Sequence, residues 1–230
     1  MESKLGKRAS VLILVFSLCM VMGTTFSLLW AEEVPEGVRT AAENGFKSLL
    51  HKIPKETLTY FNFDTAEELE KSVLGEPFRM YTILPEVILN YGGSDLPVEK
   101  MISPTPIWFF PVIADGEVRT LITVDLVGGG YQAVAVGGSN LSKEWASVIE
   151  KWPPSAGYEH TFVRVFQATA DFVLLSRVGQ AGGMVALEAG RVSLGLGAGE
   201  IYAPAQILPA LKIPVMENIK SSEDFLKNVK

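Results

Sequence analysis

The sequence is almost without cysteine. Of its 230 residues only Cys19 is a cysteine, and it lies in an apolar stretch near the N-terminus. The rest of the chain therefore cannot form a disulfide, a thiolate metal site or a cysteine nucleophile. We expect the fold to depend on a hydrophobic core, which a chain of this length is able to bury.

Histidine is scarce too, since His51 and His160 are the only two and lie far apart in the chain. They show none of the close spacings that are typical of zinc ligands. The serine hydrolase motif G-x-S-x-G and the EF-hand calcium loop are absent. Gly195, Gly197 and Gly199 alternate, but they do not form the dinucleotide-binding motif G-x-G-x-x-G. The sequence therefore contains none of these catalytic signatures, and it predicts neither a bound metal nor a cofactor.

Positive charge is in deficit. The chain has 20 Lys and Arg residues against 26 Asp and Glu residues, a net charge of −6. An acidic chain repels polyanions, and no basic patch interleaved with aromatic residues offsets this. We therefore expect no nucleic-acid partner.

What the chain does have is a cationic and then apolar N-terminus. Lys4, Lys7 and Arg8 precede residues 11–31, which contain no charged residue. This is the layout of an export signal, and the run is also long enough to cross a bilayer as a helix. Residues 1–31 are therefore predicted to be a signal peptide or an N-terminal membrane anchor. We expect an extracytoplasmic protein, either periplasmic or secreted, or one tethered to the membrane by residues 11–31 alone.

Hydrophobic periodicity divides the remaining chain into helices and strands. Helical spacing predicts a helix over residues 36–53, and Asp64-Thr65-Ala66-Glu67 has the form of a capping box that opens a short helix. From residue 78 the period changes to two, and Asp115-Gly116 is a strong hairpin signal. The predicted strands cover residues 78–84, 87–91, 107–114, 117–127, 131–136, 160–167, 171–178, 184–188 and 191–196. Further helices are predicted over residues 141–152, 205–213 and 222–229, the second of them weakened by Pro209.

This order of elements predicts an α+β fold, in which antiparallel meanders are packed by helices. The expected segments are the leader (1–31), an N-terminal helical segment (32–76) and two α+β halves (77–155 and 156–230). Local matches suggest that the halves are a degenerate repeat. Residues 78–81 match 163–166, residues 86–89 match 171–174, and the turn at residues 115–118 matches that at 189–192.

Two sets of residues are candidates for function. Glu86 and Asp171 each precede an apolar run at matching places of the two halves, so they are weak catalytic candidates as acid–base carboxylates. Trp108, Phe109 and Phe110 form an aromatic cluster between prolines. Consecutive residues of a strand point to opposite faces, so at least one ring must face away from the main core. These three residues are the candidate binding site.

The combination favours a non-catalytic binding or interaction module of the cell envelope, whose partner is an envelope protein. The observations behind this hypothesis are the leader and the lack of a catalytic constellation. The alternative is a carboxylate-dependent hydrolase, or an inhibitor or regulator of an extracytoplasmic hydrolase. An enzyme needs carboxylates that converge in a concave site, whereas a binding module needs an exposed apolar surface.

Overall fold

The described part of the chain, residues 33–93 and 97–228 of a computed structural model, mixes helices and strands. The predicted leader, residues 1–31, lies outside these described residues. The helices are α2 (Glu36–Leu49), α3 (Ala66–Lys71), α4 (Pro85–Leu89), α5 (Ser139–Lys151), α6 (Glu188–Leu194) and α7 (Pro204–Asn228). The 3-10 turns are η1 (Leu50–Lys52), η2 (Lys55–Phe61), η3 (Val98–Lys100), η4 (Pro154–Ala156) and η5 (Phe166–Ala168). The strands are β1 (Val73–Leu74), β2 (Phe78–Ile83), β3 (Ile102–Ala114), β4 (Glu117–Val127), β5 (Gly130–Gly137), β6 (Tyr158–Val165), β7 (Ala170–Arg177), β8 (Gln180–Ala186) and β9 (Ile201–Tyr202).

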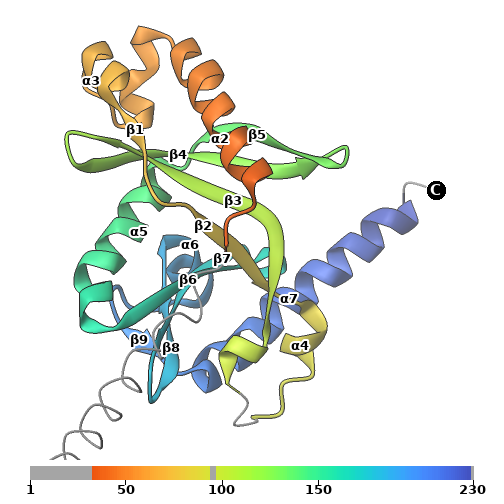
Figure 1. The fold of residues 1–230 in the computed structure, drawn as a ribbon. Coiled ribbons are helices and arrows are strands. Elements are labelled where there is room, and N and C mark those ends of the chain that lie inside the picture. Colours follow the sequence, from red (N-terminus) through yellow and green to blue (C-terminus); the bar gives the residue numbers. More distant parts are fainter. Residues whose placement is uncertain (1–32, 94–96, 229–230) are drawn as a thin grey trace, which may run out of the picture. The chain divides into compact units, whose positions relative to one another are not determined.

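The strands of the described residues form one mixed sheet (Figure 1). Their order is β5-β4-β3-β2-β6-β7-β8-β9, and β1 pairs with β3 beside this path. Strands β2 and β6 are neighbours and run parallel, with Met80 opposite Phe162, whereas the other pairings are antiparallel. An antiparallel meander therefore extends from each side of the β2–β6 pair. This arrangement confirms the predicted α+β fold with antiparallel meanders packed by helices.

Helix α5 covers one face of the sheet. Its Trp145 and Val148 belong to a buried cluster with Phe78 of β2, Phe109 of β3 and Phe162 of β6. The Phe78 ring stacks on Trp145 with ring centroids 4.1 Å apart, and Phe162 lies edge-on to Phe109. The central strands are thus held to α5 by aromatic contacts, which contribute beyond their buried area.

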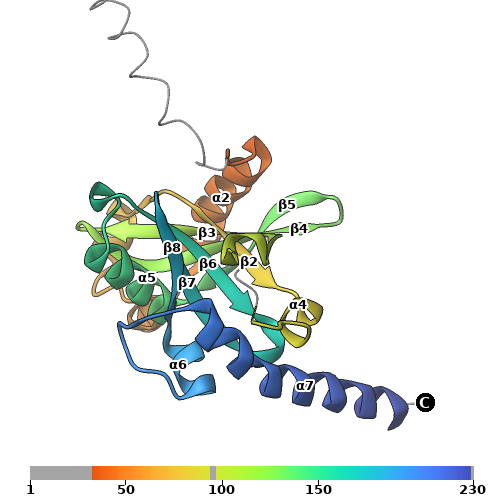
Figure 2. The ribbon, with the colours of Figure 1, turned by 90° about the horizontal axis from the view of Figure 1, so that it is seen from below.

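The opposite face carries two helices over different strands. Helix α2 packs against β4 and β5, and α7 packs against β8. Figure 2 shows α7 along its whole length. Its residues Ile207, Leu208, Leu211 and Val215 are buried in a second cluster. All of these elements belong to one compact unit, residues 35–230. The boundaries predicted near residues 76 and 155 fall inside this unit, and the division into two repeated halves stays a prediction.

Several predicted local elements are correct. Helices α2 and α5 form where helical spacing predicts them, and the turn at Asp115-Gly116 joins β3 to β4 with positive φ at both residues (50° and 80°). The capping box exists but begins one residue later than predicted. The Thr65 side chain accepts a hydrogen bond from the Glu68 N–H, and a Glu68 carboxylate oxygen accepts one from the Asp64 N–H.

Other predicted strands are wrong. Residues 85–89 form helix α4, because Pro85 at the first helical position has a φ suited to a helix start. Residues 188–194 form helix α6, which ends at Gly195 in the left-handed conformation. Two of the three matches between the halves therefore pair a helix with a strand or a turn. Residues 86–89 lie in α4 but 171–174 in β7, and Ala189-Gly190 lies in α6 rather than in a turn.

The two C-terminal helices predicted from the sequence are one continuous helix, α7. Pro209 and Pro214 both lie inside it. An interior proline removes a backbone donor, but the buried stripe of α7 packs against the sheet on both sides of these prolines and stabilises the helix. Neither α7 nor any other helix in the described ranges is long and apolar enough to cross a bilayer.

Candidate functional site

The two carboxylates predicted as catalytic candidates have different surroundings. Asp171 is only 5 % exposed and accepts two hydrogen bonds of 2.6 Å from the Arg164 guanidinium on the neighbouring strand β6. This pairing raises the pKa of Arg164. Glu86 is exposed in the first turn of α4. Both oxygens of Asp171 are thus used in a structural ion pair.

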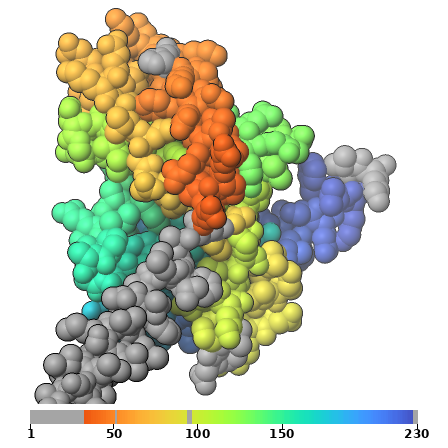
Figure 3. Space-filling view, viewed as in Figure 1, coloured from red at the N-terminus to blue at the C-terminus, as the bar shows by residue number. Residues whose placement is uncertain are grey.

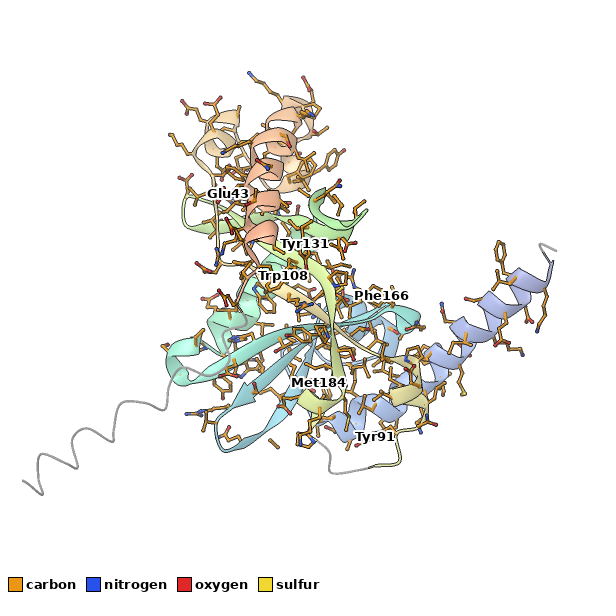
Figure 4. All side chains as sticks on the ribbon, turned by 45° about the vertical axis from the view of Figure 1, so that its right-hand side comes forward. Glu43, Tyr91, Trp108, Tyr131, Phe166 and Met184 are labelled. Carbon is orange, nitrogen blue, oxygen red and sulfur yellow. The ribbon has the colours of Figure 1, made fainter. Side chains whose placement is uncertain are left out.

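The aromatic candidates Trp108, Phe109 and Phe110 are all buried in β3. Phe109 faces the α5 cluster. Trp108 and Phe110 lie opposite Val124 and Ile122 of β4, on the other face. Figure 4 labels Trp108, which lies in the interior of the fold, and the Arg79 guanidinium lies 5.4 Å from its ring centroid. The rings do divide between two faces, as predicted, but both faces are covered, so these residues do not form an open binding surface.

The described residues offer no metal site, because no group of three or more His, Cys, Asp and Glu side chains gathers among them. His160 is half-buried in β6, and its Nε2 lies 2.8 Å from the Trp152 carbonyl oxygen. Burial lowers the pKa of His160. Its ring also lies edge-on to Trp145. Contacts of this kind are typical of a histidine that packs as part of the core.

An apolar groove lies where the N-terminal helical segment meets strand β5. It has a volume of about 520 Å³. Most of its lining side chains are apolar, and Lys52 is the only charged one. The lining residues are Leu49, Lys52, Ile53, Pro54, Thr57, Tyr60, Phe61, Val134, Ala135 and Val136. Two of them leave much apolar surface in contact with water: Tyr60 is 78 % exposed and Val134 is 48 % exposed.

One wall of the groove is built by the end of α2 and by η1 and η2. Pro54 follows η1, and its side chain prevents continuation of the helix. Turn η2 then ends at Asn62, which adopts a left-handed conformation (φ 62°). The Asn62 side-chain amide donates to the carbonyl oxygens of Arg119 and Ser139, and the Ser139 hydroxyl donates to the Tyr60 carbonyl oxygen. These bonds fix η2, and with it Tyr60 and Phe61, against the sheet.

The other wall is strand β5, which α2 approaches closely (Figure 3). Small residues make this approach possible, because a Cβ at Gly45 would collide with the side chain of Ala133. Gly37, two helical turns earlier, also lies beside β5, but an added Cβ there would lie 3.5 Å from the Tyr131 ring, in ordinary van der Waals contact. The glycines of α2 cost helix stability on their own, so close packing against β5 must compensate for them.

The groove lies beside strand β5. Three consecutive residues of this strand, Val134, Ala135 and Val136, line it. Strand β5 is the first strand in the sheet order, and no described strand pairs with its outer edge. An open strand edge exposes backbone N–H and C=O groups that can form hydrogen bonds. Apolar side chains and backbone hydrogen-bonding groups therefore occur together at this site.

The sequence did not reveal this groove, because its walls lie more than seventy residues apart in the chain. The exposed Tyr60 lies in a segment that the sequence assigned to no element. Val134 is the irregular residue of β5, at a shift in its pairing with β4, and such bulges leave no clear sequence signal. Comparisons with protein-family models, with curated proteins and with solved structures found no match to this chain.

Proposed function

We propose that this chain is a non-catalytic interaction module that binds a partner in the groove between η2 and β5. The single observation that carries this proposal is an exposed apolar groove beside an open strand edge. Exposed apolar patches of a soluble fold are typical of interaction sites. The predicted aromatic site in β3 is buried, so the proposed binding role moves from Trp108, Phe109 and Phe110 to the groove.

We further propose that the module works outside the cytoplasm, with an envelope protein as its partner. The support is the cationic and apolar leader of residues 1–31. A chain with a C-terminal tag tests this by fractionation: the tag should be found in the envelope or the medium. Recovery of the tag only in the cytosol would contradict the export proposal but would leave the groove proposal in place.

The hydrolase alternative has no specific observation in its favour. Asp171 is engaged by Arg164, and Glu86 is exposed on a short helix. An acid–base carboxylate is expected to lie free in a concave site with a perturbed pKa. The binding module is therefore the function that the geometry supports best.

Two glutamate substitutions test the groove. Val134→Glu places a charge in the groove wall, whereas Val178→Glu places the same charge at a 95 % exposed valine between β7 and β8. Full-length tagged chains are incubated with envelope extract, and the retained proteins are quantified by mass spectrometry. The native chain and the Val178→Glu variant should retain a partner that the Val134→Glu variant does not retain. The same partner, once purified, should bind the native chain directly. Identical retention by both variants would contradict the proposal.

A further inference from the structure

The outer edge of β5 has the properties of a site for an additional strand. We propose that the partner is an extended polypeptide segment that pairs with this edge and places alternate apolar side chains in the groove. This inference rests on the proposed function, since it names the kind of partner that the same groove binds. It adds a specific mode of recognition, in which backbone hydrogen bonds supply affinity and the groove supplies selectivity.

The two ends of the sheet differ in how their edges are protected. Strand β9, at one end, has only two residues, Ile201–Tyr202. Strand β5, at the other end, has eight residues and contains neither a proline nor a charged residue. Short length, proline, lysine and β-bulges are the usual ways in which proteins block unwanted strand pairing. Strand β5 has a bulge at Val134 but none of the other protections, and no described strand pairs with its outer edge.

The position of the groove fits an added strand. A new strand would lie about 4.8 Å from β5, in the space beside Val134, Ala135 and Val136. Every second side chain of such a strand would point to the same face, and the groove wall that includes Ile53 and Phe61 offers an apolar surface for these side chains. A lipid chain would fill the apolar part equally well, but it would leave the backbone groups of β5 without partners. A polypeptide satisfies both the apolar wall and the strand edge.

The charge at the rim indicates what kind of segment fits best. Lys52 lines the groove, and Lys47, Lys55 and Glu56 are exposed in the same short stretch, which is net positive although the chain as a whole has a net charge of −6. An acidic residue at one end of the segment would complement this local positive charge and help to set its direction. A second copy of the chain is the alternative occupant, and the test below distinguishes it from a separate peptide.

The test uses peptides that differ only in their backbone. Random octapeptides displayed on phage are selected on the full chain, and the best binder is synthesised with a fluorescent label. Two further versions carry N-methyl groups on alternate amides, one version for each of the two possible frames. In a paired strand only one set of alternate amides faces β5. One frame of methylation should therefore weaken binding about tenfold or more, and the other should change it little.

Each outcome has a separate meaning. Equal effects of the two methylation frames would overturn strand pairing, and if Val134→Glu still abolished binding, the groove function would stand. Binding that is unchanged by Val134→Glu would contradict both proposals. Failure to select any octapeptide would overturn the peptide inference alone. Dimers of the chain that form at micromolar concentration and disappear with Val134→Glu would identify a second copy as the occupant and also overturn the inference.

Discussion

Removing the guanidinium that pairs with Asp171 should destabilise the fold strongly. Arg164 and Asp171 face each other on neighbouring strands, and their side chains are 34 % and 8 % exposed. In Arg164→Met the Asp171 carboxylate stays buried without its partner. In Asp171→Leu the guanidinium is left unpaired, but it is partly exposed and can turn toward water. The first variant should therefore be much less stable than the second.

The size of the effect follows from burial. Leaving a buried charge unpaired costs about 3–5 kcal/mol, and the partial exposure of Arg164 places this case near 3 kcal/mol. Asp171→Leu should lower the free energy of unfolding by about 1 kcal/mol, because water can solvate the partly exposed Arg164 guanidinium that is left without its partner. The double variant Arg164→Met with Asp171→Leu replaces the pair by apolar groups and should lie within about 1 kcal/mol of the native chain.

The assay is urea unfolding followed by tryptophan fluorescence, since Trp108 and Trp145 are buried and report on the core. The free energy of unfolding is compared for the native chain, the two single variants and the double variant. Glu86→Ala is the control, because it removes an exposed carboxylate and should change stability by less than about 0.5 kcal/mol.

Two results would refute this reasoning. One is a double variant that is as unstable as the sum of the single variants, which would mean that the two side chains do not interact. The other is an Asp171→Leu chain that keeps native stability and loses a hydrolytic activity measured in the native chain. That second result would restore Asp171 as a catalytic candidate.

Three further predictions concern single residues. Burial lowers the pKa of His160, so in acid the unfolded chain binds more protons than the native one. The contribution of His160 to the free energy of unfolding is therefore fully present above about pH 6.5 and falls as the pH drops below that value. His160→Gln, which can still donate to Trp152, should lose less stability between pH 7 and pH 5 in urea titrations. Gly190→Ala should lower the melting temperature despite its better helix propensity, because the new Cβ would lie 2.6 Å from the Asp171 carbonyl oxygen. Thr65→Ala removes a helix cap and should cost about 1 kcal/mol in urea unfolding.

Local features of the fold were predictable wherever one signal dominated. Asp115-Gly116 determines its turn because a tight hairpin needs positive φ at both positions. The short apolar run after Pro85 was assigned to a strand because the hydrophobic period changes to two from residue 78, but a run of this length fits a buried helical turn equally well. Pro209 was expected to weaken a helix, yet core packing of α7 outweighs the local preference of Pro209 and of Pro214, which also lies inside it.

Nonlocal features were not predictable from the sequence. The parallel pairing of β2 with β6 joins segments that are about eighty residues apart, and no local pattern specifies it. The groove depends on the same kind of contact, because its η2 and β5 walls lie more than seventy residues apart in the chain. Asp171 was selected for its position before an apolar run, but the run continues a buried strand and the carboxylate pairs with Arg164 across it.

The most direct test of the account is hydrogen exchange at the amides of β5, measured by NMR with and without the selected octapeptide. The outer edge of β5 is unpaired in the described structure, so the amides between Gly130 and Gly137 that face away from β4 should exchange rapidly in the free chain. Addition of the peptide should slow exchange at these outward-facing amides, and N-methylation of the peptide in the pairing frame should remove the protection. Protection of the outward-facing amides in the free chain, or no change in their exchange when the peptide binds, would contradict the account.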